Sequence, residues 1–223
     1  MIARRALPGL LAAAALLRPR LAVPQVDPDA ALIAAARQGD AREVRRLLDA
    51  GARLNARDPS GATALLAATA GNHLEAAQVL IEAGADVNAK NDIQDSPYLL
   101  AGASGFTEIL RLTLARGADL KSLNRFGGTA LIPACERGHV ETVRVLLATA
   151  IDIDHVNNLG WTCLLEVAIL GDGGPRHVEV ARLLIAAGAK LNLPDRGRVT
   201  ALAHARRRGH VELANLLAAA GAR

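Results

Sequence analysis

Apolar residues recur along the chain at the spacing of an amphipathic helix, and the helical segments themselves recur at regular intervals. In the segment GHVETVRVLLATA, Val140, Val143 and Leu147 fall at positions i, i+3 and i+7, which places them on one face of a helix. Aligned segments of the same kind begin at Gly39, Asn72, Gly105, Gly138, Arg176 and Gly209. The pattern predicts six similar amphipathic helices.

A second marker shows that these helices belong to a longer repeat. Thr63, Ser96, Thr129 and Thr162 are spaced 33 residues apart, with Ala30 one period upstream and Thr200 38 residues downstream. Loop segments such as GADVNAKN (84–91) separate the units; their glycine ends a helix in the left-handed conformation and their Asn and Asp residues form turns. A fixed period of this length indicates an array of stacked units.

The loop and first-helix segments resemble the ankyrin repeat family, whose pattern runs D-x-x-G-x-T-P-L-H-x-A-A and ends in G-A-D-V-N. The matching segments are DPSGATAL from Asp58, NRFGGTAL from Asn124 and NNLGWTCL from Asn157, and the resemblance covers about residues 27–223. It implies an all-α repeat fold, an ankyrin solenoid of about six helix-turn-helix units with hairpin loops. We expect an N-terminal capping repeat in 23–57, central repeats in 58–195 and a C-terminal capping repeat in 196–223.

Two departures from the pattern affect the helices. Pro133 lies inside a predicted first helix and removes a hydrogen-bond donor, so we expect a kink there. Five extra residues, Asp172–Arg176, lengthen the turn between the two helices of the fifth unit. They are either a tolerated surface insertion or a contact loop, and the sequence leaves both open.

The first 22 residues have the order of an export signal. Paired arginines, Arg4 and Arg5, precede an apolar stretch from Ala6 to Leu17, as in secretory and twin-arginine leaders. The stretch is shorter than the ~18 residues of a membrane span, so we expect no membrane insertion of the mature chain. We therefore expect a periplasmic or secreted location. The alternative is a cytoplasmic protein on which these residues are a disordered extension or precede the true start. The segments SPYLLAG and GGTALIPACERGH also resemble a subgroup of short bacterial ankyrin proteins that often carry such leaders.

The formal charge of +4 carries no indication of nucleic-acid binding. Four of the 26 basic residues lie in the first 22 positions, which leaves 22 basic against 22 acidic residues in the rest of the chain. Nucleic-acid binding requires a basic patch on the folded domain, so we expect a protein partner and no nucleic acid. We also expect a monomer.

The histidines and cysteines suggest structural roles. His73, His139, His177 and His210 share one repeat position; stacked helices lie roughly 10 Å apart, whereas metal ligands lie about 2 Å from one ion. We therefore predict no metal site, and without a cofactor or nucleophile motif we predict no cofactor and no catalytic residue. Cys135 and Cys163 differ by five positions in the repeat, so we expect them to exceed the ~7 Å Cα limit of a disulfide and to be buried, reduced thiols.

The family resemblance implies partner contacts at the loop tips and the exposed side of the first helices. In this register we predict a partner-binding surface formed by Asp92, Ile93, Asp95, Arg125, Phe126, Leu159, Trp161, Arg207 and Arg208. Glu136, Arg137, Ile169 and Leu170 lie at the ends of first helices facing the same side. Ile93, Phe126, Leu159 and Trp161 would form an apolar stripe, since aromatic and Arg anchors dominate interfaces; local packing of Phe126 and Trp161 is the alternative. The arginines form either an anionic contact or a solvated capping face.

These observations favour a non-catalytic scaffold that binds a partner protein through its loop tips and concave face. The alternative is a secreted effector that acts on a host or competitor protein. An enzyme that uses Glu166, Asp172 and His177 ranks last, because the sequence supplies no nucleophile or cofactor motif for it.

Overall fold

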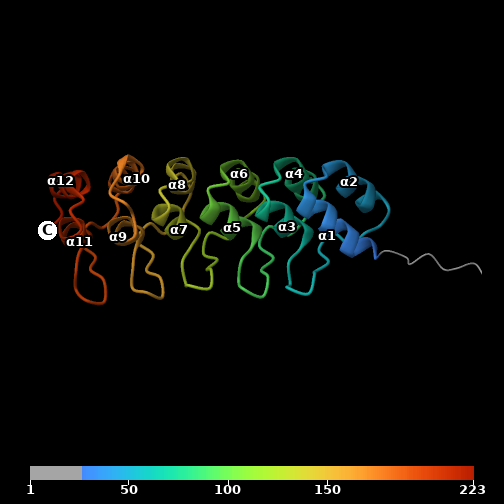
Figure 1. Cartoon of the computed structure of the whole chain (residues 1–223), viewed down its shortest axis with the longest axis horizontal. Helices are drawn as coiled ribbons and strands as arrows, with labels where there is room; N and C mark the ends of the chain where they lie inside the picture. Colours follow the sequence, from blue (N-terminus) through green and yellow to red (C-terminus); the bar gives the residue numbers. More distant parts are fainter. Residues whose placement is uncertain (1–26) are drawn as a thin grey trace, which may run out of the picture.

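The computed structural model describes residues 27–223 and contains twelve α-helices in that part of the chain (Figure 1). The predicted leader, residues 1–22, lies outside the described residues. The helices are α1 Pro28–Gln38, α2 Ala41–Asp49, α3 Ala64–Ala70, α4 Leu74–Glu82, α5 Pro97–Ser104, α6 Thr107–Ala115, α7 Leu131–Glu136, α8 Val140–Leu147, α9 Cys163–Ile169, α10 Pro175–Ala186, α11 Ala201–Arg207 and α12 Val211–Ala219.

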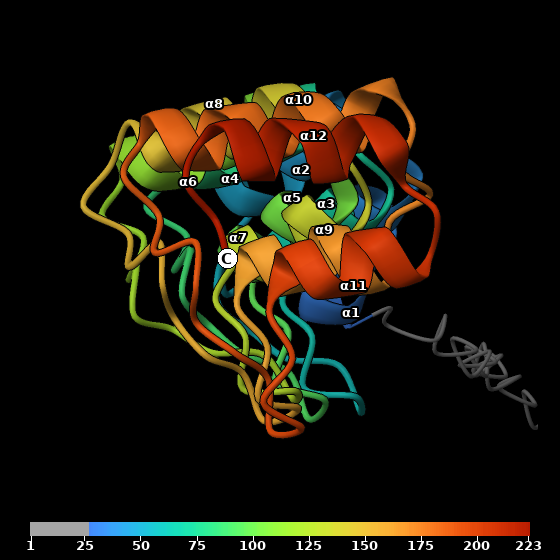
Figure 2. The same ribbon diagram turned by 90° about the vertical axis from the view of Figure 1, so that its left-hand side faces the viewer.

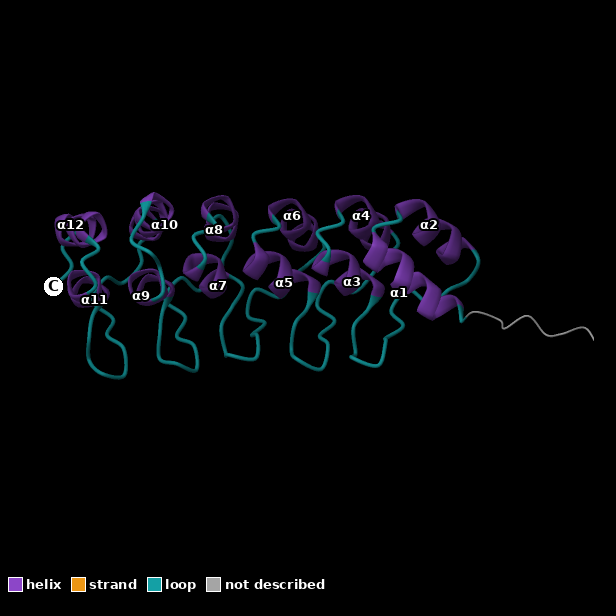
Figure 3. Cartoon of the chain, in the orientation of Figure 1, coloured by secondary structure: helices purple, strands orange, loops and turns teal. Residues whose placement is uncertain are grey.

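The helices form two parallel rows, with the loops on one side. The odd-numbered helices form the row next to the loops and the even-numbered helices form the outer row (Figure 3). Seen end-on, the loops leave the helical layers together and project away from them (Figure 2). Residues 27–223 contain no β-strand, only an isolated antiparallel bridge between Arg57 and Thr63. The prediction of an all-α solenoid with hairpin-like loops is confirmed.

The core runs through the whole array and consists almost wholly of Ala, Leu, Val and Ile. Tyr98 is an exception, and it is fully buried. Because each helix pair covers the apolar face of the next, burial in this fold depends on stacking along the array.

The repeated Thr or Ser begins most of the inner helices. The side chains of Thr63, Ser96, Thr162 and Thr200 accept a hydrogen bond from the backbone N–H three residues later, over 3.2–3.4 Å. The carbonyl of the same residue accepts from the N–H four residues later, as in the bond from Ala67 to Thr63. The cap thus satisfies N–H groups that the first turn leaves without partners.

The fourth unit departs from this arrangement because of Pro133. Position 133 would supply the N–H that bonds to the Thr129 carbonyl, and proline has none. The carbonyl instead accepts from the N–H of Ile132, three residues along, at 3.3 Å, and α7 begins one residue later than its equivalents. The hydroxyl of Thr129 has no hydrogen-bond partner among the described residues. The expected kink is therefore wrong: Pro133 lies in the first turn, where it moves the start of the helix.

Each loop tip is held by one Asx side chain. Asp58, Asn91, Asn124, Asn157 and Asp195 each accept a hydrogen bond from the N–H four residues later. Gly61, Gly127 and Gly160 turn the tips with positive φ, and in two loops Gln94 and Arg198 adopt the same conformation, at φ +66° and +60°. A non-glycine residue in this region is strained, so the repeated hydrogen bonds hold these two tips against a local cost.

Neighbouring inner helices come close together where the end of one helix meets the start of the next. A Cβ placed on Gly102, in α5, would lie 2.8 Å from the Cβ of Ala130, which caps α7. Cys135 and Cys163 occupy the same two repeat positions one unit further along, and they form a disulfide with Cα atoms 5.6 Å apart. The cysteines are buried as expected, at 0% and 1% exposure.

The prediction of reduced thiols is therefore wrong. The prediction assumed that equivalent residues of successive units lie directly opposite each other. On that assumption, two cysteines five repeat positions apart would be too far apart to form a disulfide. In the structure the start of one inner helix packs against the end of the preceding one. This shift in register brings the two cysteines within disulfide range.

Substitution of the repeated threonines distinguishes the stability contributed by the capping hydrogen bond from the effect of burying a threonine side chain. Thr63→Val removes the bond to Leu66 N–H and is expected to lower the free energy of unfolding by about 1 kcal/mol. Thr129→Val removes a buried hydroxyl that has no partner in the described residues, and is expected to leave stability unchanged or higher. Urea unfolding of both variants provides the measurement, and equal losses in the two would contradict this assignment.

The cross-link between α7 and α9 is expected to contribute strongly to stability. Non-reducing mass spectrometry should give a mass about 2 Da below that of the reduced chain, as one disulfide requires. Cys135→Ala/Cys163→Ala places alanine where Ala168 and Ala201 occupy the next equivalent pair of positions. Because the cysteines are 28 positions apart in the sequence, loss of the link should lower the free energy of unfolding by about 3 to 4 kcal/mol. The difference should vanish in a reductant, and its persistence there would assign the loss to packing.

Candidate functional site

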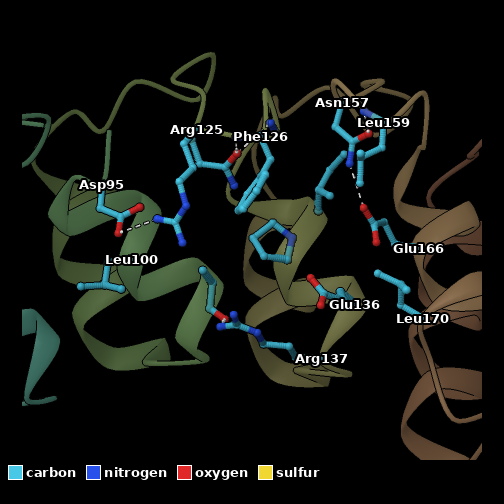
Figure 4. Close-up of a pocket in the computed structure, with 15 residues that line it drawn as sticks. Asp95, Leu100, Arg125, Phe126, Glu136, Arg137, Asn157, Leu159, Glu166 and Leu170 are labelled. Atoms are coloured by element: carbon cyan, nitrogen blue, oxygen red, sulfur yellow. Dashed lines mark hydrogen bonds and ion pairs between the residues drawn. The ribbon is translucent and has the colours of Figure 1, made fainter. Parts of the chain in front are cut away.

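A cavity of about 330 Å³ opens between the loop tips and the inner helices of the third, fourth and fifth units (Figure 4). It is lined by Asp95, Leu100, Ala103, Asn124, Arg125, Phe126, Gly128, Ile132, Pro133, Glu136, Arg137, Asn157, Leu159, Glu166 and Leu170. We call this cavity the central groove. Its walls come from two kinds of element, the projecting loops and the helices α5, α7 and α9, so the stacking of the units sets its shape.

Two asparagines fix the loops that form the upper edge of the groove. Asn124 accepts hydrogen bonds from the N–H groups of Phe126 and Gly128, at 2.9 and 3.0 Å. Asn157 holds the next loop in the same way. The N–H of Asn158 then donates to the carbonyl of Phe126 at 2.9 Å and joins the two tips. The apolar side chains at these tips therefore sit on a hydrogen-bonded framework.

Three exposed apolar side chains surround the groove. Phe126 is 53% exposed, and Leu159 and Leu170 are each 48% exposed. Single exposed apolar residues are ordinary on protein surfaces, but a group around one concavity is typical of an interaction surface.

The arginines of the groove already have partners. The Arg125 guanidinium lies 3.6 Å from the Asp95 carboxylate and 4.9 Å from the centre of the Phe126 ring, a cation–π geometry. Arg137 donates to the Ala103 carbonyl at 2.6 Å. The Arg125 contact orients Phe126. Within residues 27–223, neither arginine forms an ion pair with Glu136 or Glu166.

Glu166 is the buried charged group of the site, with 3% of its surface exposed. Its Oε1 accepts a hydrogen bond from Asn157 Nδ2 at 2.8 Å, while Oε2 has no partner among the described residues. Burial raises the pKa of Glu166 to about 7, and the nearby Glu136 carboxylate acts in the same direction; the hydrogen bond from Asn157 opposes them. Near neutral pH this carboxyl group is therefore a mixture of protonated and ionised forms.

The structure places four of the predicted surface residues on the central groove: Asp95, Arg125, Phe126 and Leu159. Glu136, Arg137 and Leu170 from the first-helix ends join them. Ile93 borders a second hollow of about 510 Å³, which shares Asp95 and Leu100 with the groove. Asp92 is exposed beside it, at the tip of the same loop.

The other predicted surface residues lie elsewhere. Trp161 is partly buried and packs against the core, as the local-packing alternative expected, so the apolar stripe lacks its largest member. Arg207 and Arg208 are exposed at the end of α11 and do not line the central groove.

Sequence reasoning did not assign Glu166 and Asn157 to this surface. The signal was available in the repeat: the fourth residue after the repeated Thr or Ser is Ala67, Leu100, Pro133 and Glu166 in successive units, then His204. Glu166 is the acid in that series. His204 takes the equivalent bond, with Nε2 2.7 Å from the carboxylate of Asp195.

Of the three residues of the enzyme alternative, Asp172 and His177 are in contact, whereas Glu166 has a different partner. The Glu166 side chain bonds to Asn157 in the groove. His177 instead lies between Asp172, at 2.7 Å from Nδ1, and the Glu136 carbonyl, at 2.8 Å from Nε2. Both ring nitrogens of His177 thus lie within hydrogen-bond distance of an oxygen.

The contacts of Asp172 give the insertion a structural role. Its carboxylate also accepts from Gly174 N–H at 2.8 Å, and α10 starts at Pro175, so the added residues form a tight turn and an extra helical turn. His73 makes the same kind of bond to the preceding unit, with Nε2 3.0 Å from the Arg37 carbonyl. The insertion therefore supports a contact between units.

The described residues contain no group of three or more His, Cys, Asp or Glu side chains placed to hold a metal ion. None of the twelve helices in 27–223 is long and apolar enough to cross a membrane.

Comparison with known proteins identifies the family. The model of ankyrin repeats (3 copies) matches residues 10–91 and 99–195, most of the chain, and the protein belongs to the ankyrin repeat family. Ankyrin repeat proteins are generally non-catalytic modules for protein–protein interaction. No curated protein matches the chain.

Solved structures with the same fold are similar over nearly the whole described region. An ankyrin repeat domain from Acinetobacter baumannii AYE is 56% identical, with a TM-score of 0.83, over 86% of this chain and 98% of that one. The ankyrin repeat protein EF0377 is 40% identical, with a TM-score of 0.82, over 85% and 97%. The human ASB11 ankyrin repeat domain is 27% identical, with a TM-score of 0.75, over 86% and 84%.

The raised pKa of Glu166 predicts a pH-dependent cost to stability. Because the folded chain binds this proton more tightly than the unfolded chain, stability falls as pH rises from about 4.5 to about 7. Glu166→Gln keeps an acceptor for Asn157 and removes the charge. It should raise the free energy of unfolding at pH 8 by on the order of 3 kcal/mol and change it little at pH 4. Chemical unfolding across this range measures the difference, and a gain independent of pH would contradict the assignment.

Proposed function

We propose that the chain is a non-catalytic binding module that holds a partner protein in the central groove. The observation that carries this proposal is the group formed by Phe126, Leu159 and Leu170, half-exposed around one concavity and held on hydrogen-bonded loops and short helices. Apolar anchors on a rigid framework lose little conformational entropy on binding, which suits a recognition surface.

Family membership supports the same function. The inner helices and loops of an ankyrin array form a continuous surface, and the ankyrin repeats that form it make up most of this chain. The groove offers apolar anchors at its edge and charged groups within, an arrangement that combines binding energy with orientation.

Truncation of the groove anchors tests the proposal. A chain tagged at its C-terminus is crosslinked in the producing cells, and captured proteins are identified by mass spectrometry. Phe126→Ala/Leu159→Ala is expected to reduce capture of the specific partner about tenfold or more, as loss of interface anchors does. Circular dichroism and thermal unfolding establish that the variant remains folded.

A matched variant controls for general loss of exposed apolar surface. Val156 and Val211 are 51% and 66% exposed and do not line the groove, so Val156→Ala/Val211→Ala should leave capture unchanged. Equal capture by the wild-type chain and the Phe126→Ala/Leu159→Ala variant would place the binding surface elsewhere.

An exported location is part of the proposal. Disulfides form and persist in oxidising compartments such as the bacterial periplasm and the cell exterior, and the buried Cys135–Cys163 link supports such a location beside the leader-like segment. A captured partner from the producing cell's own envelope favours a periplasmic scaffold. A partner from a host or competitor cell favours the effector alternative.

A further inference from the structure

The central groove contains two carboxyl groups that lack a cationic partner in the described part of the chain. Glu136 and Glu166 both line it, and neither forms an ion pair there, in contrast to Asp95, which lies 3.6 Å from Arg125. Their mutual repulsion contributes to the raised pKa of Glu166. A positive charge placed between two unpaired carboxyl groups in one concavity would be electrostatically stabilised.

The surroundings of these groups favour a cation on a long apolar stem. Phe126 and Leu159 lie at the loop tips, whereas Glu136, Glu166 and Leu170 lie on the helical side of the groove (Figure 4). Arg and Lys side chains place methylene groups along apolar surface and carry the charge at their end. A small inorganic cation would leave the apolar edge without a contact.

Glu166 adds an orientation to the site. Asn157 holds Oε1 at 2.8 Å, so the carboxyl group is fixed at one oxygen, while Oε2 is buried and lacks a partner in the described residues. A buried acceptor without a donor is costly, and an incoming N–H group would satisfy it. Arginine presents several N–H donors in a planar fork that suits carboxylates.

From this arrangement we infer that the central groove recognises an arginine side chain of the partner protein, with the guanidinium between Glu136 and Glu166 and the stem against Phe126 and Leu159. The inference rests on the proposed function in taking this groove as the contact surface, and it assigns the chemical class of the residue that the partner inserts.

A small probe tests the site without the natural partner. N-acetyl-arginine amide is titrated into the full chain, whose methyl groups are labelled with carbon-13, and the methyl signals of the protein are followed by NMR. The methyl signals of Leu159 and Leu170 are expected to shift and saturate at millimolar probe. N-acetyl-citrulline amide, which is neutral and almost the same shape, is expected to bind at least tenfold more weakly.

Two variants connect binding to the carboxyl groups. Glu136→Gln/Glu166→Gln should reduce the affinity for the arginine probe about tenfold or more. Glu75→Gln/Glu212→Gln makes the same change of charge at exposed positions on α4 and α12 and should leave it unchanged. Equal binding of arginine and citrulline probes, or equal losses in the two variants, would overturn the inference.

The pH dependence supplies a second readout. Arginine binds the ionised form of Glu166, so the affinity of the wild-type chain should rise several-fold between pH 6 and 8. The other titratable groups that line the groove are Asp95, Arg125, Glu136 and Arg137. With Glu166→Gln the rise should disappear; a rise that persists would exclude Glu166 from the contact.

The probe and capture experiments can fail separately. If the groove anchors are needed for capture but the arginine probe shifts no methyl signal, the binding function stands and the arginine assignment is wrong. If the probe binds but partner capture is unchanged in the Phe126→Ala/Leu159→Ala variant, the arginine site stands and the proposed function of the groove is wrong.

Discussion

The whole structure depends on one constraint: each helix pair has apolar faces that only the neighbouring pairs can cover. A unit alone would expose residues such as Leu65, Leu131 and Leu165, all at most 1% exposed in the array, and would not repay the entropy of ordering them. Stacking requires the inner helices to come close together, and this explains the small residues at their ends. It also fixes the loops side by side, since each loop leaves from the start of an inner helix. The groove is thus a consequence of the stacking.

The repeat period predicts the fold well because every unit solves the same packing problem. The threonines at 33-residue intervals mark helix starts, and the Asx residues mark loop tips, so one interpretation applies several times. Predictions that needed the register between units were less successful. The disulfide was missed because Cys135 was compared with the wrong turn of its neighbour. Pro133 was expected to kink a helix. It does not do so because it lies in the first turn of α7, and the sequence does not show this in advance because the proline itself determines where α7 starts.

In the candidate site, too, the repeat period predicted which positions are exposed, but it did not predict the direction and environment of individual side chains. Ile93, Phe126 and Leu159 share one repeat position and are all about half exposed, so register alone predicted their exposure. Trp161 lies two residues further along, at the position of Ala62 and Gly128, where the chain returns to the core; its size suggested an anchor although its position indicated packing. Glu166 occupies a position on the inner face where the third and fourth units carry Leu100 and Pro133. Its significance depends on burial and on Glu136, and neither can be read from one segment.

The placement of Glu166 bears on function because it opposes stability. A carboxyl group that is almost completely buried, faces another carboxylate and has one oxygen without a donor destabilises the fold at neutral pH. Leucine at the equivalent position in the third unit shows that the repeat accommodates an apolar residue there. Local violations of the packing rules tend to coincide with functional sites, where a missing interaction is supplied by a ligand. In this chain the violation lies on the groove that also gathers the exposed apolar side chains, so two independent features, unpaired charge and apolar exposure, select the same surface.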